Sequence, residues 1–325
     1  MKRVVISEAH QLALIDVDDP QPQDGEVLLK VKTIGICGSD LHVFEGHHPF
    51  VTYPVMPGHE VSGEIIAVGA GVDESLIGRN AVIEPSLPEG ERPRFEPGRY
   101  NIASELKVMG FQVPGAMAEY FALSLDRIHL VPDHFTHDMG AVVEPTAVAV
   151  HGLRLAGNIA GLNVGVIGAG SIGLLTAQIA KAYNAASVTV AEFDDHRRNV
   201  SETLGFNTTR TLAEQQFDVV FECVGVESSM RSAIFACRKG ATVVVMGVFG
   251  KEVSIPVGLI QDWELRILGS LMYVSDDYKE AIRLLASGQV KVDSLITHRF
   301  PLNQARQAFD TALQRGTALK VLIEN

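Results

Sequence analysis

Residues 164–173 read VGVIGAGSIG, an apolar run followed by three glycines spaced as G-x-G-x-x-G. In a βα turn the first glycine allows the tight turn, the second lets the backbone approach a pyrophosphate, and the third lets the helix pack on the strand. The helix expected after the turn has Leu175 and Ile179 on one face, and its N-terminus would attract phosphate. We therefore predict a dinucleotide site that includes Gly168, Gly170, Ile172 and Gly173.

A second apolar strand, residues 187–190, is followed by Glu192. This is close to the ~20-residue offset at which an acidic side chain meets the ribose hydroxyls of a dinucleotide. Glu192 would repel a 2′-phosphate, so the sequence favours NAD over NADP. Arg197 is either a further contact to the cofactor or a charge on a helix surface. The plain alternative for the whole motif is a glycine turn that binds nothing.

The rest of the chain fits around this motif as two kinds of domain. Apolar strands alternate with helical patterns after Pro145, which predicts a doubly wound parallel sheet. Before Pro145, short runs punctuated by glycine and proline, such as 27–31 and 64–68, predict an antiparallel β domain. We expect an α/β protein with three parts: an N-terminal catalytic domain, a dinucleotide-binding domain and a C-terminal segment that rejoins the first. Their predicted bounds are 1–145, 146–286 and 287–325.

The composition of the chain argues against some classes of binding partner and indicates a cellular compartment. The 325 residues carry a formal net charge of −12, which argues against nucleic acid or an anionic membrane as a partner. Three cysteines are too few for a disulfide framework, so we expect a reducing compartment, the cytoplasm by default. No stretch reaches the length of a membrane span, and residues 1–17 show no signal-peptide core.

Two short segments of the first domain carry possible metal ligands. Residues 37–42 read CGSDLH, and residues 58–60 read GHE. A catalytic zinc needs three protein ligands and one open position, and Cys37, His59 and Glu60 would supply that number if the fold brings them together. Taken singly, each has a plainer interpretation, because a lone cysteine is usually a small buried hydrophobe and a lone histidine a hydrogen-bonded one.

These segments, together with the dinucleotide motif, resemble the zinc-dependent medium-chain dehydrogenase/reductase family along essentially the whole chain. The resemblance is strongest to the branch of sorbitol, threonine and related sugar-alcohol dehydrogenases, where a Gly-His-Glu motif and a later Glu-Pro, here Glu144-Pro145, replace the ligands of other branches. It implies a Rossmann domain, a GroES-like catalytic domain, and one zinc on Cys37, His59 and Glu60. Glu144 is expected beside the metal, exchanging with Glu60.

The same resemblance implies the chemistry. We expect hydride transfer to NAD from a secondary alcohol of a polyol, sugar or sugar acid, with zinc stabilising the alkoxide. Ser39 and His42 match positions that pass the proton outward, and Tyr273 matches a position of the cofactor site. The family also implies a homo-oligomer, a dimer or tetramer. Two alternatives stay open: a zinc-free medium-chain reductase that uses NADPH, and a nucleotide-binding regulator without catalysis.

Two departures from the family pattern bear on substrate and metal content. Val43 and Met272 stand where sorbitol enzymes carry an aromatic residue and an arginine, so we expect a substrate other than sorbitol.

The lobe 87–104 lacks the four cysteines of a structural zinc site, so we expect no structural zinc. Packing of Phe95, or a contact of Glu89 with Arg92, would then have to hold the lobe. The four corresponding positions are Glu89, Arg92, Phe95 and Ala103.

Overall fold

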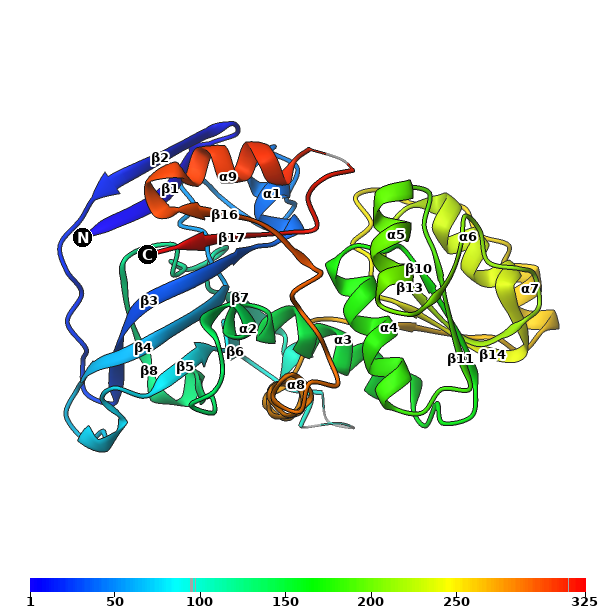
Figure 1. The fold of residues 1–325 in the computed structure, drawn as a ribbon, viewed down its shortest axis with the longest axis horizontal. Helices are drawn as coiled ribbons and strands as arrows, with labels where there is room; N and C mark the ends of the chain where they lie inside the picture. Colours follow the sequence, from blue (N-terminus) through cyan, green and yellow to red (C-terminus); the bar gives the residue numbers. More distant parts are fainter. Residues whose placement is uncertain (94–95, 97, 315) are drawn as a thin grey trace. The chain divides into compact units, whose positions relative to one another are not determined.

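The computed structural model describes residues 1–93, 96, 98–314 and 316–325. The chain divides into two compact units (Figure 1). Unit 1 comprises Met1–Glu144, Val274–Ala286 and Ile296–Asn325, and unit 2 comprises Pro145–Tyr273 and Ser287–Leu295. Within the described residues, no helix is long and apolar enough to cross a membrane.

Unit 2 is built on a six-stranded sheet in the order β12-β11-β10-β13-β14-β15, and every neighbouring pair is parallel. The strands are β10 (Asn163–Ile167), β11 (Ser187–Ala191), β12 (Asn207–Thr209), β13 (Phe217–Glu222), β14 (Cys237–Val245) and β15 (Arg266–Gly269). The helices are α4 (Ser171–Ala182), α5 (Asp195–Thr203), α6 (Glu227–Ala236) and α7 (Val257–Asp262). In Figure 1, α4 and α5 lie on one side of this sheet and α6 and α7 on the other. The predicted doubly wound parallel sheet is confirmed.

Unit 1 is mainly antiparallel β structure, as predicted. Its largest sheet has the order β16-β17-β3-β4-β5-β9, with β8 paired to β3, and two small sheets pair β1 with β2 and β6 with β7. The red C-terminal strand β17 runs beside the blue strand β3 in Figure 1, and the two are antiparallel. The strands are β1 (Lys2–Glu8), β2 (Gln11–Asp16), β3 (Glu26–Ile36), β4 (Glu60–Val68), β5 (Asn80–Ile83), β6 (Ser86–Glu89), β7 (Glu105–Val108), β8 (Tyr120–Ser124), β9 (Ile128–Leu130), β16 (Ile296–Pro301) and β17 (Lys320–Glu324).

Short helices connect or cover these strands. They are α1 (Gly38–Phe44), α2 (His137–Ala141), α8 (Ser275–Ala286) and α9 (Ala305–Ala312), while α3 (Val143–Ala156) begins in unit 1 and continues into unit 2. Alternate residues of β3, Val27, Leu29 and Val31, are fully buried and enter one apolar core with residues of β4, β17 and α9. This period of two is what a strand with one core-facing side requires.

The lobe 87–104 is held by contacts that the sequence did not predict. Glu89 forms an exposed ion pair with Lys107, with Oε2 and Nζ 2.9 Å apart, and Arg92 lies over the ring of Tyr100, 5.9 Å from its centroid. The expected contact of Glu89 with Arg92 is therefore wrong, because Glu89 pairs with Lys107 of β7 and Arg92 lies over Tyr100. Phe95 lies outside the described residues.

A buried carboxylate anchors the lobe to the large sheet. Glu84 is fully buried and accepts hydrogen bonds from Tyr100 (2.5 Å), Ser86 (3.1 Å) and Arg127 (3.1 Å), and it pairs with Nε2 of His129 (2.8 Å). Burial alone would raise the pKa of Glu84, but the hydrogen bonds from His129 and Tyr100 and the charge of Arg127 hold it below the usual value. Tyr100 in turn accepts a hydrogen bond from the backbone of α8, so this cluster ties three segments together.

Candidate metal centre and dinucleotide site

The end of β3 places the first candidate ligand. Cys37 follows directly after β3 and is the N-cap residue of α1, so its side chain lies where the strand becomes a helix. Its backbone N–H donates to Oδ2 of Asp40 at 2.9 Å, which closes the first turn of α1. Because Asp40 is fully buried, the hydrogen bond that holds this turn is shielded from solvent.

The start of β4 brings the other two ligands to the same place. Glu60 of β4 lies opposite Gly35 of β3 in the antiparallel register. Gly35 is only two positions before Cys37, so this pairing brings Glu60 close to the cysteine. A Cβ added at Gly35 would overlap the carboxylate of Glu60, so a glycine is required there to make room for it. His59 and Glu60 are 3% and 1% exposed, a degree of burial that polar side chains tolerate only with partners.

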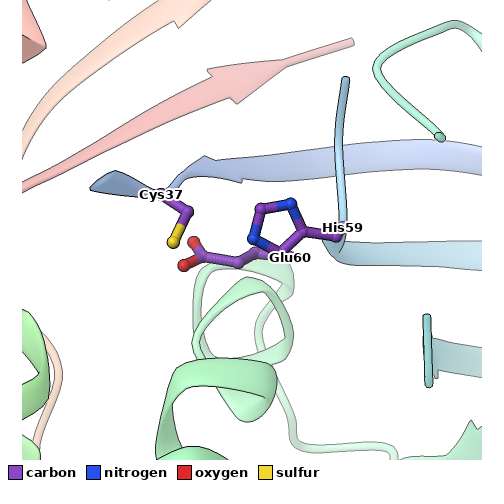
Figure 2. Close-up of side chains that lie close together, drawn as sticks. All are labelled: Cys37, His59 and Glu60. Atoms are coloured by element: carbon purple, nitrogen blue, oxygen red, sulfur yellow. The ribbon is translucent and has the colours of Figure 1, made fainter. Parts of the chain in front are cut away.

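Cys37, His59 and Glu60 therefore converge from the end of one strand and the start of the next. Figure 2 shows the sulfur of Cys37, the ring of His59 and the carboxylate of Glu60 close together. One candidate ligand atom from each lies within 4.8 Å of the others. The set of thiolate, imidazole and carboxylate is chemically suited to zinc and leaves room for a fourth ligand.

Asp40 lies beside the candidate ligand His59 and is not among the site residues predicted from the sequence. Its Oδ1 lies 3.5 Å from Nδ1 of His59, and neither atom has a hydrogen-bond partner within the described residues. A carboxylate on the far nitrogen of a histidine fixes the ring so that its other nitrogen can bind a metal. Burial opposes charge on the ring, yet Asp40 and Cys37 raise the pKa of His59 well above its usual value. The signal was the acidic residue inside residues 37–42.

Lys320 is the second missed residue. Its Nζ lies 2.8 Å and 2.6 Å from the two carboxylate oxygens of Glu60, and both side chains are almost completely buried. Burial alone would lower the pKa of Lys320, but the carboxylate of Glu60, with Cys37 and Glu144 nearby, raises it. The ammonium therefore stays charged and offsets one negative charge of the ligand set. A lysine at the start of the apolar strand β17 signals a buried charge, but it does not indicate the partner of that charge.

The remaining predicted site residues of unit 1 lie around this centre with different exposure. Ser39 donates a hydrogen bond from its hydroxyl to the sulfur of Cys37 at 3.1 Å, and His42 is exposed on the same short helix. Glu144, at the start of α3, is 8% exposed and close enough to act on the charge of Lys320, but it is not part of the group of three ligand atoms. Val43 is fully buried in the core of unit 1.

The predicted dinucleotide motif forms the expected turn between β10 and α4. Gly168 has a φ of +97°, a conformation that favours glycine, and a Cβ added at Gly173 would overlap the carbonyl oxygen of Gly168. A Cβ added at Gly170 would meet no atom within 4 Å, so the space beside this residue is open to a ligand. Ile172 lies in the first turn of α4. The three glycines therefore meet the separate steric requirements of a turn that could hold a pyrophosphate.

Glu192 lies immediately after β11, beside this turn. Its carboxylate accepts hydrogen bonds from the backbone N–H groups of Ala169 (2.9 Å), Phe193 (2.8 Å) and Asp194 (3.0 Å). It is thus fixed next to the glycine turn while remaining partly exposed. Nε of Arg197 is buried without a hydrogen-bond partner among the described residues, and Tyr273 is fully buried at the end of unit 2.

Comparison with known proteins identifies the family of this chain. Residues 23–133 match the family described as alcohol dehydrogenase GroES-like domain, and residues 171–287 match zinc-binding dehydrogenase. Sorbitol dehydrogenase of Gallus gallus is 33% identical over 340 residues, which cover 99% of this chain and 95% of that protein. D-xylulose reductase of Saccharomyces cerevisiae is 30% identical over 345 residues, covering 99% and 97%.

A solved structure shows the same similarity in three dimensions. A zinc-binding dehydrogenase of Sinorhizobium meliloti 1021, bound to NADP, has a TM-score of 0.93 and 30% identity, and the match covers 100% of this chain and 99% of that one.

Proposed function

Because this chain belongs to the zinc-dependent medium-chain dehydrogenases, in the branch of the sorbitol and related polyol dehydrogenases, we propose that it oxidises a secondary hydroxyl of a polyol with NAD. The single observation that carries the proposal is the convergence of Cys37, His59 and Glu60, buried beside one another at the junction of β3, α1 and β4. A zinc-free reductase has no use for a buried thiol, imidazole and carboxylate in this arrangement.

The residues present fit the metal that the family uses. Cys37, His59 and Glu60 would hold zinc, which when bound acts as a Lewis acid toward an alcohol oxygen. Asp40 keeps the ring of His59 in its orientation, and Lys320 keeps the carboxylate of Glu60 in place. With the charge of Glu60 offset, Glu144 can approach the centre without making it strongly anionic, which supports the two carboxylates as exchanging ligands.

We assign removal of the proton of the substrate hydroxyl to two residues of α1, Ser39 and His42. The hydroxyl of Ser39 lies against the sulfur of Cys37, and His42 is three residues further on, on the same side of the helix and exposed to solvent. We therefore assign Ser39 as the group that accepts the proton at the centre and His42 as the group that releases it to water. Both side chains come from the same short helix, α1.

The cofactor is NAD, and Glu192 supports this choice. A carboxylate held by three backbone N–H groups beside the glycine turn is positioned for the ribose hydroxyls and repels a 2′-phosphate. We assign Gly168, Gly170, Ile172 and Gly173 to the pyrophosphate region, and Arg197 to a further contact with the cofactor. The predicted cofactor contact of Tyr273 is not carried into this assignment, because its side chain is fully buried.

We also infer a homo-oligomer and a cytoplasmic location. In the described part of unit 2, β15 pairs on one side only, with β14, so its other edge has free backbone groups. Val257 and Leu271, which flank β15 along the chain, are 64% and 49% exposed. An open edge with apolar neighbours is suited to pairing with a second copy. The three cysteines are free, as expected in a reducing compartment.

A substrate panel tests the proposed function. Formation of NADH is followed with xylitol, sorbitol and galactitol, using the wild type and the Cys37→Ala variant. We expect turnover of at least one polyol by the wild type and a loss of more than about 100-fold in the variant, since the metal would lose its thiolate. Oxidation of NADPH with a quinone, unchanged in Cys37→Ala, would support the reductase instead. No turnover in either assay would support the regulator.

A further inference from the structure

An aromatic ring that no part of the proposed mechanism uses lies against the metal centre. The ring of Phe111 has its centroid 4.9 Å from that of His59, at a tilt of 43°, and it stacks on the ring of His48 at 4.9 Å with only 12° between the planes. His59 is buried, whereas Phe111 is partly exposed. Phe111 is therefore an apolar surface next to a metal ligand that solvent, and hence a substrate, can reach.

Close backbone packing places this ring. A Cβ added at Gly115 would lie 2.6 Å from the carbonyl oxygen of Gly58, and one added at Gly110 would lie 3.2 Å from the amide nitrogen of the same residue. Glycine at both positions lets the segment 110–115 lie directly on the Gly58-His59 backbone. The ring of Phe111 is thereby fixed beside His59 by the main chain, which is how a site residue is held precisely.

Two hydrogen bonds join this segment to the loop that carries His48. The side chain of Gln112 accepts from the N–H of Val108 and donates to the carbonyl oxygen of Phe50, both at 2.9 Å. Nδ1 of His48 accepts from the N–H of Phe50 at 3.3 Å, and burial lowers the pKa of His48. His48 is thus a neutral ring at neutral pH, suited to stacking behind Phe111 without bringing a charge to the centre.

We propose that Phe111, backed by His48, is a specificity-determining residue of the substrate site, whose ring packs against the C–H groups of the polyol chain next to the reacting carbon. The inference rests on the proposed function. Polyols have apolar C–H faces between their hydroxyls, and such faces pack on aromatic rings as other hydrocarbon groups do. Val43, where sorbitol enzymes carry an aromatic residue, cannot provide this wall because it is buried in the core. Phe111 supplies a ring from a different segment.

The test compares substrates that do and do not reach beyond the reacting carbon. The variants are Phe111→Ala and Phe111→Leu, with Phe50→Ala as the matched control. Phe50 is an exposed phenylalanine that meets His48 edge-on at 6.2 Å and forms its hydrogen bonds through the backbone. The kcat/KM for xylitol is measured beside that for propan-2-ol, and the affinity for Co²⁺ is measured on the metal-free proteins.

We expect Phe111→Ala to lower kcat/KM for xylitol about 10- to 100-fold, the range for loss of an apolar pocket contact, with propan-2-ol within about 3-fold of wild type. Phe111→Leu should lie between, and Phe50→Ala should equal wild type. Unchanged Co²⁺ affinity would exclude an effect through His59. An equal loss for both substrates, or no loss, would overturn the proposal while leaving the enzyme a dehydrogenase. A wild type that oxidises no alcohol would instead remove the proposed function itself.

Discussion

Replacing Lys320 by methionine should destabilise the metal-free protein strongly. Methionine has nearly the same length but no charge, so the carboxylate of Glu60 would remain 1% exposed with its ammonium partner removed from both oxygens. Leaving one member of a buried ion pair unpaired costs about 3–5 kcal/mol. We expect a loss of that size in the free energy of unfolding, measured by urea denaturation with circular dichroism on protein stripped of metal.

A double variant separates this effect from loss of packing. In Lys320→Met with Glu60→Gln, no buried charge is left alone, so the double variant should be more stable than the sum of the single variants by about 2–3 kcal/mol. Added Zn²⁺ should also recover part of the loss in Lys320→Met, because a divalent cation would take over the charge of Glu60. A loss under about 1 kcal/mol, or strict additivity, would refute the assignment of Lys320 as the partner that holds Glu60.

Three further outcomes follow from the contacts described. Glu84→Gln should lower the free energy of unfolding by about 1–3 kcal/mol at pH 7, because it weakens a buried hydrogen-bonded cluster. The pKa of Glu84 is lowered on folding, so its charge stabilises the protein above the unfolded pKa of about 4.3, and this stabilisation is lost as the pH falls through the folded pKa. In denaturation measured as a function of pH, the variant should therefore lose less stability on acidification than the wild type. His42→Asn should lower kcat about 10-fold or more with zinc content unchanged, and an unaltered kcat would remove His42 from the proton path. Glu192→Ser should raise the ratio of kcat/KM for NADP over NAD about 10-fold or more in cofactor kinetics, and a constant ratio would contradict the role of Glu192.

The parts predicted well are those whose signal is local in sequence. The glycine turn at 168–173 forms because strand, turn and helix are consecutive, and Glu192 lies one strand further on. The parallel sheet follows from the same alternation of strand and helix. For the metal centre, three ligand types are recognisable in two short segments, and the antiparallel register of β3 and β4 is the physical reason that they meet.

The residues that the sequence could not assign act over long separations. Lys320 is 260 positions from Glu60, and no pattern within β17 indicates that its one buried charge faces the start of β4. Phe111 reaches His59 only because Gly110 and Gly115 let two backbones touch. Val43 stands where sorbitol enzymes carry an aromatic residue, and the short helix α1 directs its side chain into the core, so the expectation of a substrate other than sorbitol stays a prediction. The domain bounds, the individual site roles and the absence of a structural zinc stay predictions.

Zinc content measured together with activity tests the central claim most directly. The purified protein is analysed for zinc, treated with a chelator, assayed for polyol-dependent formation of NADH, and assayed again after Zn²⁺ is restored. We predict one zinc per chain, loss of turnover with its removal, and recovery with its return, because Cys37, His59 and Glu60 form the one group of ligands among the described residues that could hold the metal. Full turnover by the metal-free protein would contradict the account, and two tightly bound zincs would contradict its assignment of a single site.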